Sequence, residues 1–114
     1  MKFLVAGMCC AVLLAGCAAD NSPDSSIAAG DAAAYTSAER PSLTIFTMVN
    51  NRTGSGGHTS LMVNASQRVI FDPAGSFRDE RVTDRFDVLY GITPGWLNAY
   101  KSAHARVSHH VVTQ

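Results

Sequence analysis

The stretch that decides the fold runs from residue 57 to residue 75 and reads Gly-His-Thr-Ser-Leu-Met-Val-Asn-Ala-Ser-Gln-Arg-Val-Ile-Phe-Asp-Pro-Ala-Gly. Two runs with strand-forming side chains, residues 58–63 and 68–72, flank a polar stretch that can turn the chain. Pro73 and Gly75 end the second run, because both residues interrupt strands. The stretch therefore predicts a β-hairpin.

The position of the turn determines which side chains of the hairpin lie near each other. A turn centred on residues 65 and 66 places His58 near Asp72 or Pro73. A carboxylate beside an imidazole fixes the tautomer of the ring and raises its basicity, which a general base needs. We therefore take His58 and Asp72 as the candidate catalytic pair. The alternative is a loop histidine beside an aspartate that ends a strand by accepting hydrogen bonds from nearby amides.

The segments around the hairpin complete an α+β pattern. Thr93 and Pro94 are a good helix start, and Trp96 and Tyr100 share one helical face. The predicted elements outside the hairpin are a strand over residues 43–49, a short strand over 87–90, a helix from about Pro94 to His104 and a last strand over 105–114. We therefore expect one α+β domain over residues 42–114, with a small antiparallel sheet and one helix.

The C-terminal end of this domain is unusual. A domain of this size has a marginal core, and a strand at the end of the chain needs a partner. We therefore expect the domain to be incomplete at its C-terminus.

The N-terminal residues have the features of an export signal. Lys2 precedes an uncharged apolar run, residues 3–14, which is too short to span a bilayer. The run ends in Leu14-Ala15-Gly16-Cys17, which resembles the lipobox of bacterial lipoproteins. The resemblance implies cleavage before Cys17, acylation of that cysteine and attachment to the cell envelope by lipid. An ordinary signal peptide with a chance cysteine is the alternative.

The residue after the cysteine bears on sorting. Ala18 stands where an inner-membrane retention signal would often have Asp. By resemblance to the enterobacterial sorting rule, the outer membrane is favoured over the inner membrane.

Residues 17–41 differ in composition from the domain that follows. They are rich in Ala, Ser and Asp and show no apolar periodicity. Such a segment predicts a disordered tether that spaces the domain from the membrane.

Charge and cysteine content exclude several classes of protein. Nine basic and nine acidic side chains balance, which argues against a nucleic-acid partner. Cys9 and Cys10 would leave with the signal peptide and Cys17 would carry lipid, so no disulfide framework is expected. The location makes peptidoglycan or another envelope protein the expected partner.

The hairpin resembles the opening of permuted papain-like domains, a group that includes NlpC-like amidases, relatives of lecithin:retinol acyltransferase and small bacterial lipoproteins of unknown function. The matching pieces are Gly57-His58, Val63 and residues 69–75, within a resemblance that covers about residues 43–112. The resemblance implies His58 as base, Asp72 as orienting residue, a cysteine nucleophile at a later helix start, and stem peptides or acyl lipids as substrates.

This chain departs from that group at the nucleophile. No cysteine follows Cys17, and a papain-like reaction needs a thiolate. We therefore expect no intact catalytic centre in this chain. Two interpretations stay open: an N-terminal fragment of a cysteine amidase or acyltransferase, or a scaffold retained for binding.

The four histidines are the candidate metal ligands of the sequence. His109 and His110 are adjacent on a predicted strand, so their side chains point to opposite faces. A site that joins them or His104 to His58 and Asp72 can be drawn, but it has no recognised ligand spacing. The sequence alone therefore predicts neither a metal nor another cofactor.

Overall fold

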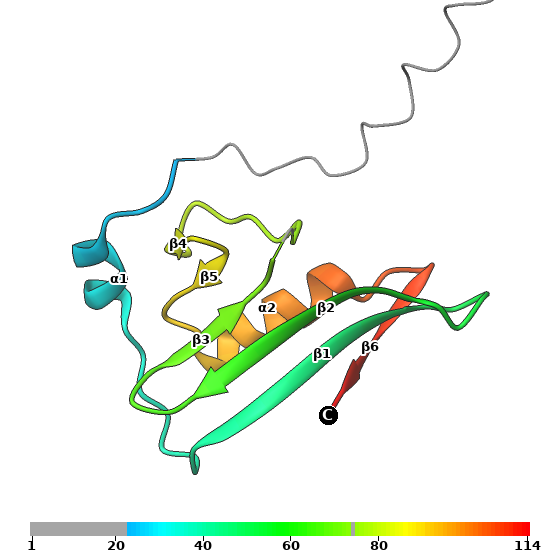
Figure 1. Ribbon diagram of the computed structural model, residues 1–114, viewed down its shortest axis with the longest axis horizontal. Coiled ribbons are helices and arrows are strands. Elements are labelled where there is room, and N and C mark those ends of the chain that lie inside the picture. The colour runs from blue at the N-terminus through cyan, green and yellow to red at the C-terminus, as the bar shows by residue number, and fades with distance from the viewer. Residues whose placement is uncertain (1–22, 74) are drawn as a thin grey trace, which may run out of the picture.

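The chain folds as an α+β domain, as predicted, in a computed structural model that describes residues 23–73 and 75–114. Six antiparallel strands form one sheet in the order β4-β5-β3-β2-β1-β6, and Figure 1 shows α2 along one side of it. The elements are α1 (Ile27–Ala33), β1 (Ser42–Asn50), β2 (Gly56–Asn64), β3 (Arg68–Phe71), β4 (Asp84–Arg85), β5 (Val88–Leu89), α2 (Pro94–His104) and β6 (His109–Thr113).

The predicted hairpin is the centre of the sheet. β2 pairs with β3 from Asn64 opposite Arg68 to Leu61 opposite Phe71. This register differs by one residue from a turn centred on residues 65 and 66, because three residues separate the paired ends. A shift of one residue exchanges the two faces of a strand. In the observed register, His58 and Asp72 fall on the same face of the sheet as Met62 and Ile70.

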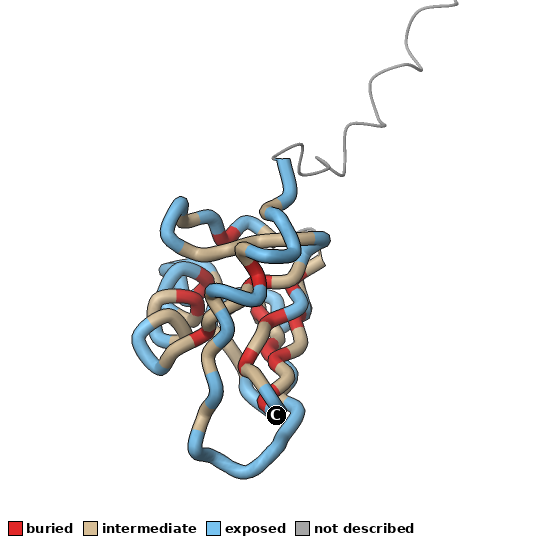
Figure 2. Tube along the Cα trace, turned by 90° about the vertical axis from the view of Figure 1, so that its left-hand side faces the viewer, coloured by how far each residue is buried: buried red, intermediate tan, exposed pale blue. Residues whose placement is uncertain are grey.

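That face carries the core, and α2 covers it. Phe46, Met48, Met62 and Ile70 are buried on the strands, and the ring of Tyr100 from α2 lies 5.9 Å from that of Phe46. Figure 2 shows the resulting alternation of buried residues with more exposed ones along the trace. Every second residue of the strands points to this buried face, and the spacing of four places Trp96 and Tyr100 on the side of α2 that packs against it.

The boundaries of α2 agree with the sequence prediction. The helix runs from Pro94 to His104, and the Thr93 side chain accepts a hydrogen bond from the Trp96 amide at 3.2 Å. Proline at the first helical position loses no hydrogen bond, because that amide has no partner within the helix.

The last strand is shorter than predicted. β6 begins at His109, after a turn in which Arg106 and His109 exchange backbone hydrogen bonds, and it pairs with β1. The sheet order makes β6 an edge strand.

The prediction of a disordered tether is wrong for the part of residues 17–41 that the structure describes. Residues 24–40, which we call the strap, contain α1 and lie against the sheet instead of extending freely. The Arg68 amide donates to the Tyr35 carbonyl at 2.7 Å, and the Asn64 side chain donates to the Arg40 carbonyl at 3.1 Å. Arg68 is only 1% exposed, and its guanidinium donates hydrogen bonds to the side chains of Ser37 and Glu39 in the strap.

Two glycines allow the strap to approach the sheet closely. A Cβ at Gly30 would touch the ring of Tyr90 at 3.4 Å. Gly91 has a φ of +69°, and a Cβ there would lie 2.5 Å from the Ala33 carbonyl oxygen. A larger residue at Gly91 would meet both backbone strain and a clash.

The export signal and Cys17 lie outside the described residues. Within residues 23–73 and 75–114, neither helix has the length and the apolar character needed to cross a bilayer.

Candidate functional site

His58 and Asp72 lie in direct contact. His58 is on β2 and Asp72 directly follows β3, and the two meet where the hairpin opens. Nε2 of His58 and Oδ1 of Asp72 form a hydrogen bond. The Asp72 side chain is 2% exposed, whereas that of His58 is 23% exposed. The proximity predicted from the turn is therefore present in the fold, while the catalytic role of the pair stays a prediction.

The contact assigns the proton on the neutral His58 ring. A carboxylate only accepts hydrogen bonds, so the proton is on Nε2 and the lone pair is on Nδ1. Asp72 thus orients the ring and leaves one basic nitrogen free. This is the arrangement that a general base or a metal ligand requires.

A third residue, His104, completes the cluster. It is the last residue of α2, and its ring stacks on that of His58 with centroids 5.9 Å apart and planes 13° apart. Its Nδ1 donates to the Tyr100 carbonyl at 2.9 Å, so the lone pair of the neutral ring is on Nε2. His104 is 9% exposed.

The sequence pattern does not single out His104 from the other histidines as the partner of His58 and Asp72. The spacing of four between Tyr100 and His104 places both on one helical face, which is a visible signal. Which part of the hairpin that face covers depends on the path of residues 76–93, and their pattern did not reveal this path.

Two buried polar atoms of the cluster are orphans. Oδ2 of Asp72 and Nε2 of His104 accept no hydrogen bond from any residue within 23–73 and 75–114. A buried polar atom without a partner costs about 1–3 kcal/mol. Because both atoms carry lone pairs, only a proton donor or a cation can satisfy them.

Tyr100 lies beneath the cluster in the core. Its hydroxyl donates to Oγ of Ser60 at 2.6 Å, and both residues are buried. Burial raises the pKa of Tyr100 well above its ordinary value of 10. The Ser60 hydrogen bond lowers this pKa, and Asp72 raises it through its charge and through a polar interaction with the phenol. The phenol therefore stays neutral at physiological pH and keeps α2 fixed on β2.

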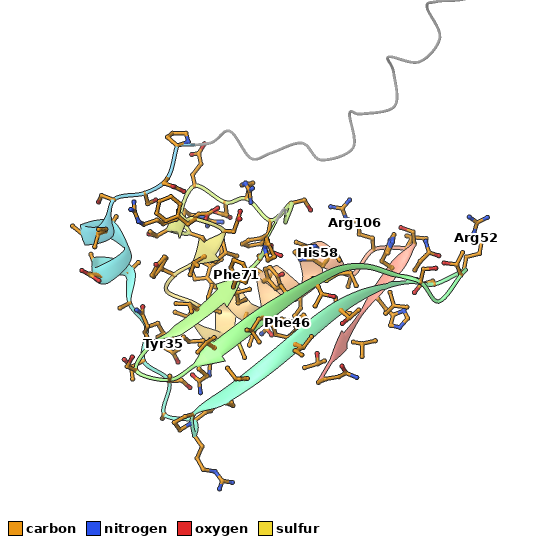
Figure 3. The ribbon with its side chains drawn as sticks, in the orientation of Figure 1. Tyr35, Phe46, Arg52, His58, Phe71 and Arg106 are labelled. Carbon is orange, nitrogen blue, oxygen red and sulfur yellow. The ribbon has the colours of Figure 1, made fainter. Side chains whose placement is uncertain are left out.

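The cluster borders a cavity of about 280 Å³. His58 and His104 line it, and Asp72 contacts two lining residues, His58 and Gly75. Figure 3 shows His58 between the sheet and α2, with Arg106 in the connection that follows the helix. The remaining lining residues are Met48, Gly57, Ser76, Arg106 and His109. A small ligand can therefore reach the two imidazoles from solvent.

Gly75 packs directly against the Asp72 carboxylate. A Cβ at this position would lie 1.9 Å from Oδ2, so no side chain fits while the carboxylate keeps its place. The Gly75 amide also donates to the Asp72 carbonyl at 3.0 Å. Gly75 thus shapes the site by leaving room for the Asp72 carboxylate.

No family model matches the chain, and neither does any curated protein or solved structure. The resemblance to permuted papain-like domains stays a prediction.

The other two histidines lie outside the cluster. His109 lines the cavity and bonds Ser108 at 2.8 Å. His110 bonds the Asn51 side chain at 2.6 Å. Neighbouring strand residues thus take different partners, and His110 offers a matched control for tests of the cluster.

Proposed function

We propose that the protein is a lipid-anchored component of the cell envelope whose folded domain binds a ligand in the cavity beside His58, Asp72 and His104. The outer membrane is the favoured location. The observation that carries the binding role is the pair of orphan atoms, Nε2 of the cavity-lining His104 and Oδ2 of Asp72, which contacts the lining residues His58 and Gly75.

The anchor is supported by the N-terminal sequence. Lys2, the uncharged run that follows and Leu14-Ala15-Gly16-Cys17 are the features that lipoprotein processing needs. A diacylated or triacylated Cys17 would hold the protein stably at the membrane surface. Peptidoglycan or another envelope protein is within reach of a domain held there, and the balanced charge disfavours nucleic acid.

Binding is preferred over thiol hydrolysis because of the chain's composition. The residues after Cys17 include no cysteine, whereas a papain-like reaction uses a thiolate as nucleophile. His58 and Asp72 can orient a ligand or hold a proton without a thiolate nearby.

The anchor is tested by expressing the full-length gene in a bacterium with labelled palmitate. We expect label in the wild-type chain and in Cys10→Ser, since Cys10 leaves with the signal, and no label in Cys17→Ser. Mass spectrometry should find the mature chain beginning at acylated Cys17. An unmodified mature chain that begins elsewhere would disprove the anchor.

A second candidate function is supported by the His58–Asp72 hydrogen bond itself. The pair has the parts of a general base, as in a cysteine amidase or acyltransferase whose nucleophile is supplied elsewhere. This candidate is tested by hydrolysis of an activated ester, p-nitrophenyl acetate, by the full chain at neutral pH. We expect the wild-type chain to hydrolyse the ester faster than free imidazole does at the same concentration. His58→Ala should abolish this excess rate, and His110→Gln should leave it unchanged. Equal rates in both variants would exclude the base.

A further inference from the structure

We infer that His58, Asp72 and His104 together bind one divalent transition-metal ion of the zinc type. This inference rests on the proposed binding role of the cavity and names its ligand. It adds a metal site that the sequence pattern did not predict, because the three residues come from β2, the end of β3 and the end of α2.

The donor set suits such an ion. One ligand atom from each side chain, a ring nitrogen or a carboxylate oxygen, lies within 4.8 Å of the other two. Atoms that each lie about 2.1 Å from a tetrahedral zinc ion are about 3.4 Å apart, so a small movement brings the three together. Two imidazoles and one carboxylate form a ligand set of catalytic zinc and of non-haem iron sites.

The protonation of the cluster favours a cation over a hydrogen-bond donor from the protein. Nδ1 of His104 donates a hydrogen bond to the Tyr100 carbonyl, which leaves the lone pair of the neutral ring on the buried Nε2. Oδ2 of Asp72 is also buried without a partner among the described residues. Two acceptors facing one small region repel each other unless a positive charge or a water molecule lies between them.

The surroundings of the ligands also resemble a metal site. Metal-bound histidines commonly donate their second ring nitrogen to a carbonyl or carboxylate, and His104 does so to Tyr100. At His58, the ion would take the place of the Nε2 proton that contacts Asp72, and binding would release that proton. The cavity beside both rings provides an entry path and room for a water or substrate atom as a further ligand.

The test uses the full-length chain without a polyhistidine tag, with Cys9, Cys10 and Cys17 all replaced by Ser in every arm. The replacements remove thiols that would bind zinc themselves and prevent acylation. Calorimetry with Zn²⁺ should give one ion per folded chain. His58→Gln, Asp72→Asn and His104→Gln should each weaken binding by at least about 10-fold, and His110→Gln should leave it unchanged.

A second measurement covers variants that fail to fold. In the same background with all four histidines intact, long-range ¹H–¹⁵N spectra should show zinc-dependent shifts of the His58 and His104 ring nitrogens and none for His110. Absence of zinc binding by the folded chain, or shifts confined to His109 and His110, would overturn the inference and indicate water between the orphan atoms. Because this background cannot be acylated, a negative result leaves the lipid anchor standing, and failure of the anchor leaves the metal site standing.

Discussion

Arg68 on β3 and Glu39 in the strap form an ion pair, with Nη2 of Arg68 2.8 Å from Oε2 of Glu39. The pair is asymmetric, since the Arg68 side chain is 2% exposed and that of Glu39 is 72% exposed. Nε of Arg68 also donates to the Asn64 side chain at 3.2 Å. The buried cation is therefore satisfied by several partners, of which only the carboxylate lies in solvent.

This asymmetry predicts unequal effects of mutation. Arg68→Ala should lower the free energy of unfolding by about 3 kcal/mol or more, because it removes buried side-chain volume and strands the groups that Arg68 satisfies. Glu39→Gln should lower it by about 1 kcal/mol or less, because water screens the exposed partner. Urea denaturation of both variants measures the difference. Equal losses would show that the exposed carboxylate, and not the buried network, stabilises this part of the fold.

Tyr100→Phe tests the hydrogen bond between α2 and the sheet. The substitution keeps the ring against Phe46 and leaves Oγ of Ser60 without the phenol as its buried partner. The free energy of unfolding should fall by about 1–2 kcal/mol. The double variant Tyr100→Phe with Ser60→Ala should recover part of this loss, because it removes both polar partners. No recovery in the double variant would mean that the loss comes from packing.

The raised pKa of Tyr100 predicts how stability depends on alkaline pH. The unfolded chain loses this proton near pH 10, whereas the folded chain holds it to higher pH. The contribution is therefore complete below pH 10 and falls as pH rises beyond it, by up to about 1.4 kcal/mol per pH unit. The midpoint temperature of thermal unfolding should fall more steeply between pH 9 and pH 11 for wild type than for Tyr100→Phe. Parallel curves for the two proteins would contradict the shift.

Gly75→Ala tests how the site is shaped around Asp72. The added methyl group would occupy the position of Oδ2, so the carboxylate must move away from His58. We expect the His58 Nε2 proton signal in ¹H–¹⁵N spectra to lose the downfield shift that a carboxylate partner gives it. Ala substitution at Gly57, where a Cβ would have no neighbour closer than 3.7 Å, is the matched control and should leave the signal in place.

Local patterns in the sequence were sufficient for the hairpin and for α2. Residues 58–72 have strand-forming side chains on both sides of a polar turn, and Thr93 and Pro94 define a helix start by themselves. These features act within a few residues of each other, so they can be predicted without knowledge of the rest of the fold. The contact between His58 and Asp72 was predictable for the same reason, since both belong to one hairpin.

The strap and His104 depend on contacts between segments far apart in the chain. Part of the hold on the strap comes from the backbone carbonyls of Tyr35 and Arg40, and every sequence offers such groups. A signal for it was present in Arg68, a charged residue on the inward face of a strand, which needs partners from elsewhere. His104 reaches His58 only because α2 crosses the hairpin, and no periodicity encodes that crossing.

The route of the strap determines how mechanical force enters the domain. Asp24 bonds the Phe86 amide, and the Ser25 amide bonds the Asp84 carbonyl, so the chain is fastened near β4 before it reaches β1. A pull on the chain before residue 23 would first break these two contacts, one after the other. Tension would therefore reach the hairpin that carries His58 and Asp72 only after the strap had detached from the rest of the domain.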